Sequence, residues 1–192
     1  MAKGKIVAIV LIVAAIIILL MIFGAWYVGT RNKLVTLDEG IDSAWAEIDN
    51  QLKRRSDLIP NLVETVKGYA KQEREVFIQI AEARARLSGA RTVGEAAAGY
   101  NELQTALGRL LVVVERYPEL KSNENFIRLQ DELAGTENRI AVARKRYNDS
   151  VREFNTKIRR FPASIVANRL GFIKREYFEI EEQAREVPRV EF

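Results

Sequence analysis

Residues 6–28 read IVAIVLIVAAIIILLMIFGAWYV, a run of 23 residues without a charged side chain. A helix of this length spans about 35 Å, enough to cross a bilayer core of about 30 Å with some tilt. Basic residues flank the run on both sides, and Trp26 and Tyr27 stand where interfacial aromatic side chains collect. The sequence therefore predicts a transmembrane helix over residues 6–28 that anchors the chain in a lipid bilayer.

A cleaved signal peptide is the rival interpretation of this run. Its apolar part would be about 7–15 residues long and would end in a small-x-small cleavage site. The exit Phe23-Gly24-Ala25-Trp26 lacks that pattern. We expect an uncleaved, single-pass anchor in the cell membrane, preceded by a short flank of residues 1–5. Because the flanking basic residues nearly balance, they leave the side of the remaining chain open.

The composition of the 192-residue chain excludes several kinds of chemistry. Without cysteine or histidine there is no disulfide, thiol nucleophile, imidazole ligand or Ser-His pair. Glycine-rich phosphate loops are absent as well. We therefore expect no enzymatic activity, no cofactor and no metal. The net charge of +4 is too modest to indicate nucleic-acid binding.

The chain beyond the anchor has a helical pattern almost throughout, and we assign residues 29–185 to one all-α bundle. Apolar residues recur at helical spacing from Leu34 to Leu87, which predicts one long helix. Pro60 interrupts this stretch and predicts a kink rather than a break. Gly89 suits the left-handed residue that follows a helix.

Two further long helices and a short one follow in the predicted order. Thr92 and Glu95 form a capping box at the start of the second helix, and Tyr117-Pro118 ends it. The third helix begins at Ser122 and carries a seven-residue apolar repeat up to Pro162. We expect the short fourth helix over residues 173–185 and an extended tail over residues 186–192. Short connections between such helices predict an antiparallel, up-and-down bundle.

Polar residues interrupt the apolar seams of two helices. Gln51 and Arg55 fall on the seam of the first helix, and Gln130 and Glu137 on that of the third. An Arg55–Glu137 pair across the bundle would account for both interruptions. Such buried pairs add little stability but can fix helix register. We interpret these residues as structural rather than as a binding site.

Basic residues crowd the third helix. Residues 139–160 hold eight lysines and arginines against two acids. A basic stripe beside a membrane would suit anionic lipid or another polyanion, and its candidate contacts are Arg144, Lys145, Arg146 and Arg152. A solvated face balanced by acids on neighbouring helices is the alternative.

Residues 54–70, RRSDLIPNLVETVKGYA, resemble the RR.DLIPNLVE.VKGYA signature of the LemA family. The similarity continues through LQ.EL.GTENRIA.AR of residues 129–144, Tyr147-Asn148, Phe154-Asn155, Tyr177-Phe178 and residues 190–192. The resemblance implies a single-pass membrane protein with a helical bundle and no established reaction. It adds weight to a set of signature residues as a shared interaction or structural site: Arg55, Asp57, Pro60, Asn61, Gln130, Glu137, Asn138 and Arg139.

The function that these features favour is a non-enzymatic scaffold or adaptor at the membrane. It would act through helix–helix contacts with a membrane-protein partner or with further copies of itself, so we expect a homo-oligomer. Phe172 and Phe178 are the apolar residues that we expect on the contact surface. Binding of anionic lipid or another polyanion through residues 139–160 is the alternative.

Overall fold

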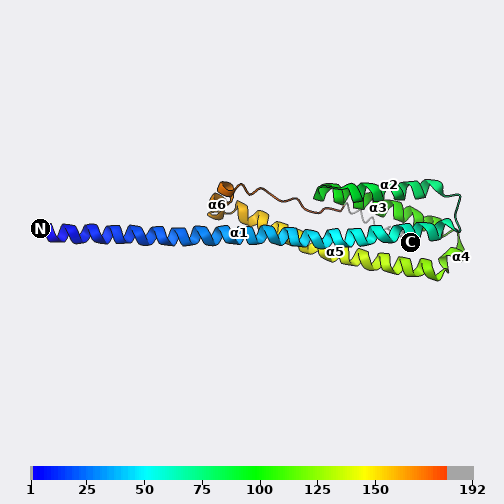
Figure 1. Cartoon of the computed structure of the whole chain (residues 1–192), viewed down its shortest axis with the longest axis horizontal. Helices are drawn as coiled ribbons and strands as arrows, with labels where there is room; N and C mark the ends of the chain where they lie inside the picture. The colour runs from blue at the N-terminus through cyan, green and yellow to red at the C-terminus, as the bar shows by residue number, and fades with distance from the viewer. Residues whose placement is uncertain (1, 181–192) are drawn as a thin grey trace, which may run out of the picture. The chain divides into compact units, whose positions relative to one another are not determined.

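A computed structural model describes the backbone of residues 2–180 and the side chains from residue 10 onward (Figure 1). Within this part of the chain the protein is all-helical and has no strand. It contains α1 (Ala2–Lys67), α2 (Arg74–Gly89), α3 (Val93–Val114), α4 (Pro118–Lys121), α5 (Glu124–Arg159) and α6 (Ala163–Leu170). The prediction of an all-α chain with a long, apolar N-terminal helix is confirmed.

The chain divides into two compact units. Unit 1 contains the described residues up to Asp42 together with Ser150–Arg175. Unit 2 contains Ser43–Asp149 and the described residues from Glu176 onward. Helices α1 and α5 each contribute to both units, whereas α2, α3 and α4 belong to unit 2 and α6 belongs to unit 1.

The predicted long helix from Leu34 to Leu87 is two helices, so that prediction is wrong in one detail. Helix α1 continues through Pro60 but ends at Lys67, and α2 begins at Arg74. Gly68 follows the end of α1, and the Tyr69 and Ala70 amides both bond to the Val66 carbonyl in a turn. The apolar spacing misled the prediction because the turn leaves the periodicity on both sides intact.

The ends of the middle helices agree with the sequence pattern in most respects. The capping box at Thr92 and Glu95 is present at the start of α3, as predicted. Pro118 opens the short α4 after the end of α3. The cap of α5 is Asn123 rather than Ser122, since the Asn123 side chain accepts a bond from the Phe126 amide at 3.1 Å.

The position of the short helix and the glycine that ends a helix both differ from the prediction. The short helix lies at Ala163–Leu170 instead of over residues 173–185, and residues 172–180 are not helical. Gly171, with φ of 74°, supplies the left-handed residue after α6, whereas Gly89 lies within α2. The remainder of the predicted fourth helix and the predicted tail at 186–192 fall outside the described residues.

Candidate functional site

Arg55 and Glu137 form a salt bridge within unit 2, which confirms the predicted pair. The Arg55 Nη1 atom lies 2.8 Å from Glu137 Oε2. Arg55 is only 5% exposed and comes from α1, while Glu137 comes from α5 and keeps 38% of its side chain accessible. Arg55 Nη1 also donates to the Leu133 carbonyl at 3.1 Å. The guanidinium therefore ties α1 to both the backbone and a side chain of α5.

Helix α3 completes this polar cluster with two side chains that the sequence did not single out. Gln104 accepts from Arg55 Nη2 at 2.7 Å and donates to Glu137 Oε2 at 2.5 Å. The Tyr100 hydroxyl donates to the same carboxylate oxygen at 2.5 Å. Tyr100 and Gln104 are four residues apart, so they lie on the same face of α3. A glutamine on this otherwise apolar face was the sequence feature that could have indicated the cluster.

The cluster raises the pKa of the Tyr100 hydroxyl. Burial, followed by its hydrogen bond to the Glu137 carboxylate, raises the pKa of Tyr100 well above its ordinary value of 10.0. The phenol consequently keeps its proton around pH 10, where an ordinary tyrosine loses it. The Arg55 guanidinium carbon lies 5.8 Å from the Tyr100 ring centroid, a cation–π contact. Among the described residues, Arg55 Nε is the buried side-chain polar atom left without a hydrogen-bond partner.

A groove of about 480 Å³ opens over this cluster. Arg55, Gln130 and Glu137 all line it, so the structure brings these three predicted residues together. Much of the remaining wall comes from leucine side chains, which are Leu62, Leu107, Leu111 and Leu133. The groove is therefore largely apolar, and its polar lining is the Arg55–Glu137 ion pair with Gln104, Gln130 and Asp131. This composition is suited to binding a helix or an apolar segment.

Pro60 and Ser56 create a second polar contact, between α1 and α2. Proline has no N–H, so the carbonyl of Ser56, four residues earlier, loses its usual helical partner. Arg84 of α2 replaces it by donating from Nε to the Ser56 carbonyl at 3.0 Å, with Ser56 Oγ at 3.2 Å. The signature proline thus frees a buried backbone acceptor that a neighbouring helix uses.

The other signature residues do not gather at one place. Asp57, Asn61, Asn138 and Arg139 are exposed. Arg139 Nε donates to Gln51 at 3.2 Å, whereas Asp57 lines a different hollow, beside Lys53 and Arg84. The structure therefore divides the predicted set into a buried cluster and scattered surface positions.

Two asparagines on α5, which were not among the predicted site residues, hold the non-helical segment. In unit 2, Asn148 accepts from the Phe178 amide at 2.9 Å and donates to the Phe178 carbonyl at 3.1 Å. In unit 1, Asn155 bonds both backbone groups of Arg175, each at 2.9 Å. The repeated pairs Tyr147-Asn148 and Phe154-Asn155, seven residues apart, were the signal.

Phe178 is buried, which corrects the expectation that it forms an exposed contact patch with Phe172. Its ring packs against Trp45 and Tyr100, with centroids 5.8 and 6.3 Å apart. Phe172 is half-buried in unit 1, edge-on to Phe154. The two side chains therefore serve the interiors of different units.

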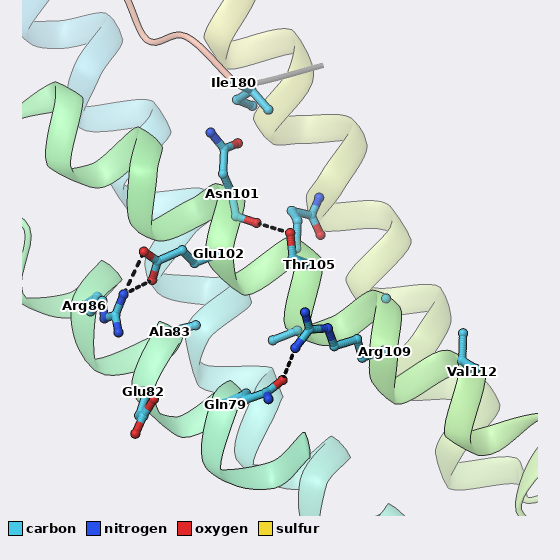
Figure 2. Close-up of a pocket in the computed structure, with 13 residues that line it drawn as sticks. Gln79, Glu82, Ala83, Arg86, Asn101, Glu102, Thr105, Arg109, Val112 and Ile180 are labelled. Atoms are coloured by element: carbon cyan, nitrogen blue, oxygen red, sulfur yellow. Dashed lines mark hydrogen bonds and ion pairs between the residues drawn. The ribbon is translucent and has the colours of Figure 1, made fainter. Parts of the chain in front are cut away.

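A wider hollow of about 760 Å³ lies between α2 and α3, and Figure 2 shows its lining. Arg86 Nη1 lies 2.8 Å from both carboxylate oxygens of Glu102, and Arg109 donates to Gln79 at 2.6 Å. These side chains bridge the two helices across the hollow (Figure 2). Arg86, Glu102 and Arg109 are thus engaged in holding the helix pair together.

The predicted basic face is partly neutralised. Lys145 lies 3.4 Å from Asp149, Arg144 is half-buried and Arg146 is exposed. Arg152 is exposed but belongs to unit 1, whereas the other three belong to unit 2. No group of three or more potential metal ligands occurs among the residues that the structure describes.

Comparison with known proteins identifies the family of this chain. The model of the LemA family matches residues 44–192, most of the chain. The chain belongs to the LemA family. Its relatives include "Protein LemA" of Metamycoplasma hominis, 28% identical over 171 residues, covering 88% of this chain and 76% of that protein. "Magnetosome protein MamQ" of Magnetospirillum gryphiswaldense is 27% identical over 183 residues, covering 82% of this LemA-family chain and 67% of the relative.

A further relative is "Magnetosome protein MamQ 2" of Paramagnetospirillum magneticum, 26% identical over 183 residues with the same coverage. The LemA match includes the Arg55–Glu137 cluster and the asparagines that hold residues 172–180. The match begins beyond the apolar part of α1.

Proposed function

We propose that this LemA-family protein is a non-enzymatic scaffold, anchored in the cell membrane by a single pass of α1, that assembles with further copies of itself. The observation that carries the anchor is the surface of α1. Every residue from Val10 to Ala25 is exposed, and all of them are uncharged. An apolar surface of this extent is unfavourable in water, and the helix is long enough to cross a membrane.

The groove over the Arg55–Glu137 cluster supports the scaffold part of the proposal. The polar side chains of the cluster bond one another apart from Arg55 Nε, and much of the remaining lining is leucine. Leu111 is 44% exposed at its edge. We propose that unit 2 is an antiparallel helical bundle and that this groove receives a helix from a second copy of the chain.

The mass of the full-length protein in mild detergent tests this proposal. We expect a uniform homo-oligomer that Leu111→Glu converts to smaller species. Val142→Glu is the matched control, because Val142 is also exposed but lies outside the groove. A wild-type monomer, or an oligomer that both variants leave intact, would contradict self-assembly through the groove.

Polyanion binding is the second candidate, favoured by the consecutive Arg144, Lys145 and Arg146 on α5. Reversing all three to glutamate should abolish binding of inositol hexaphosphate, a soluble polyanion, at low salt, where such attraction is strongest. Absence of binding by the wild-type chain under those conditions would exclude this role.

A further inference from the structure

The part of unit 1 around α6 combines exposed apolar side chains with positive charge. We call residues 159–174, which include α6, the α6 corner. Phe161 is 81% exposed, Ile173 77% and Ile165 56%. Residues 159–174 contain four lysines and arginines and no acid. Exposure of such large apolar side chains to water is unfavourable, so a surface that faces only water does not account for them.

The ion pair between α1 and α5 indicates which residues of α1 lie at the same height as the α6 corner. Lys33 Nζ lies 3.9 Å from Glu153 Oε1 in unit 1. Within this unit α5 runs back toward the N-terminal part of α1 (Figure 1). Arg160 follows Glu153 by seven residues, about 10 Å of helix. Seven residues back from Lys33 is Trp26, so the α6 corner begins level with the end of the apolar run.

The exposure of the side chains along α1 agrees with this position of the α6 corner. All residues from Val10 to Ala25 are exposed, whereas Trp26, Tyr27 and Thr30 are partly covered and Leu34 is fully buried. Protein contacts therefore begin where the bilayer surface is expected. Trp26 and Tyr27 are residues that favour the headgroup region.

We propose that the α6 corner lies on the bilayer surface, with Phe161 and Ile165 inserted at the boundary between headgroups and acyl chains and Arg159, Arg160 and Arg169 at anionic lipid phosphates. The inference deepens the proposed function, because it needs α1 to cross the membrane. Apolar side chains between arginines bind membranes by combining insertion with attraction to anionic headgroups. These arginines have no ion-pair partner within the described part of the chain.

The absence of cysteine makes a direct test possible. Single cysteines carry a nitroxide in the full-length protein, reconstituted in phosphatidylcholine–phosphatidylglycerol vesicles. Phe23→Cys marks the lipid interior, and Val35→Cys marks water, because it lies about 13 Å along α1 beyond Trp26. Phe161→Cys and Ile165→Cys are the test sites. We expect both to be more accessible to oxygen than to a water-soluble nickel chelate, as Phe23→Cys is.

Charge reversal tests the role of lipid. Arg159→Glu with Arg160→Glu and Arg169→Glu should give the Phe161 nitroxide the accessibility of the Val35 site. The control carries the same change in net charge through Arg74→Glu, Arg91→Glu and Arg128→Glu on exposed positions of unit 2. It should leave the Phe161 nitroxide in lipid.

The outcomes separate the two proposals. A Phe161 site that behaves like Val35 while Phe23 stays in lipid would overturn the α6 corner proposal alone. Shielding of Phe161 from both relaxation agents would also overturn it and would indicate a protein contact. A Phe23 site in water, with the protein removed by alkaline carbonate, would overturn the proposed anchor and the α6 corner proposal together.

Discussion

Helix α1 has two parts that meet different surroundings. Its residues from Val10 to Ala25 are apolar and exposed at every position. In its last part only one face is buried, through Ile48, Leu52, Ile59, Leu62 and Val66. A helix that is apolar all round suits lipid, whereas an apolar stripe suits packing against protein in water. The two parts therefore differ both in their hydrophobicity and in how apolar side chains are distributed around the helix.

The two parts also treat charge differently. The apolar part has none, whereas the last part buries Arg55 and surrounds it with Glu137, Gln104 and the Leu133 carbonyl. A charge is tolerated there because its partners are supplied by α3 and α5. Changes that add charge to the first part or remove partners from the second should sharpen this contrast.

The largest effect is expected from two arginines in the apolar part. Ala15→Arg with Ile18→Arg should weaken membrane insertion by about 6 kcal/mol, since each arginine near the bilayer centre costs about 3 kcal/mol. Asn32→Arg with Val35→Arg is the control on exposed positions beyond the run. Alkaline carbonate extraction measures retention, which only the first variant should lose. Equal retention of both variants would contradict the assignment of the apolar part to lipid.

Glu137→Leu should give the next largest effect, a loss of about 3 kcal/mol in the free energy of unfolding of unit 2. The Arg55 guanidinium would remain buried without its counter-ion. Urea unfolding followed through Trp45, in a Trp26→Phe background, measures it, because Trp45 packs on Tyr147 and Phe178.

Two further variants make the Glu137 test specific. Glu132→Leu, at an exposed position of α5, should change stability by less than about 0.5 kcal/mol. Arg55→Met combined with Glu137→Leu should restore most of the lost stability, because no charge is left unpaired. A double variant as unstable as Glu137→Leu would argue against an electrostatic origin of the loss.

Arg84→Leu should destabilise unit 2 by about 2 kcal/mol, because the buried Ser56 carbonyl then lacks a donor. Pro60→Ala provides the N–H that proline lacks. In that background, Arg84→Leu should cost less than about 1 kcal/mol in urea unfolding, since the new backbone amide at position 60 replaces the guanidinium. An equal cost in both backgrounds would show that Pro60 and Arg84 act independently.

The smallest effect is a pH dependence caused by the raised pKa of Tyr100. Above about pH 10 the unfolded chain loses the Tyr100 proton while the folded chain keeps it. The unfolded state then binds fewer protons, so stability should fall with rising pH by about 1.4 kcal/mol per unit. Tyr100→Phe should show a shallower decline than the wild type in urea unfolding. An equal decline of stability with pH in both proteins would contradict the conclusion that the folded chain keeps the Tyr100 proton above about pH 10.

Local patterns predicted much of the helical fold and part of the site. The capping box at Thr92 and the apolar run of α1 are determined by residues that are close together in the sequence, so both could be predicted from it. The Arg55–Glu137 pair was predictable because each residue interrupts an otherwise apolar seam. Its partners were harder to find, since Tyr100 and Gln104 belong to a third helix whose orientation no local rule fixes.

The missed features depend on contacts between distant parts of the chain. Ile173, Tyr177 and Ile180 have a spacing that a helix also shows, so the pattern favoured a helix over residues 173–185. The described part of this segment is instead held through its backbone by asparagine side chains of α5. The break after Lys67 was missed because the turn preserves the apolar period on either side.

We expect α1 to pass from lipid to water close to Trp26. Single cysteines placed one at a time over residues 10–45, in full-length protein in vesicles, would test it through reaction with a water-soluble maleimide. We predict no reaction from Val10 to Ala25 and reaction at exposed positions such as Val35 and Gly40, with Leu34 and Ile41 protected. Reaction throughout Val10 to Ala25 at the rate seen for Val35 would contradict the placement of this part of α1 in lipid.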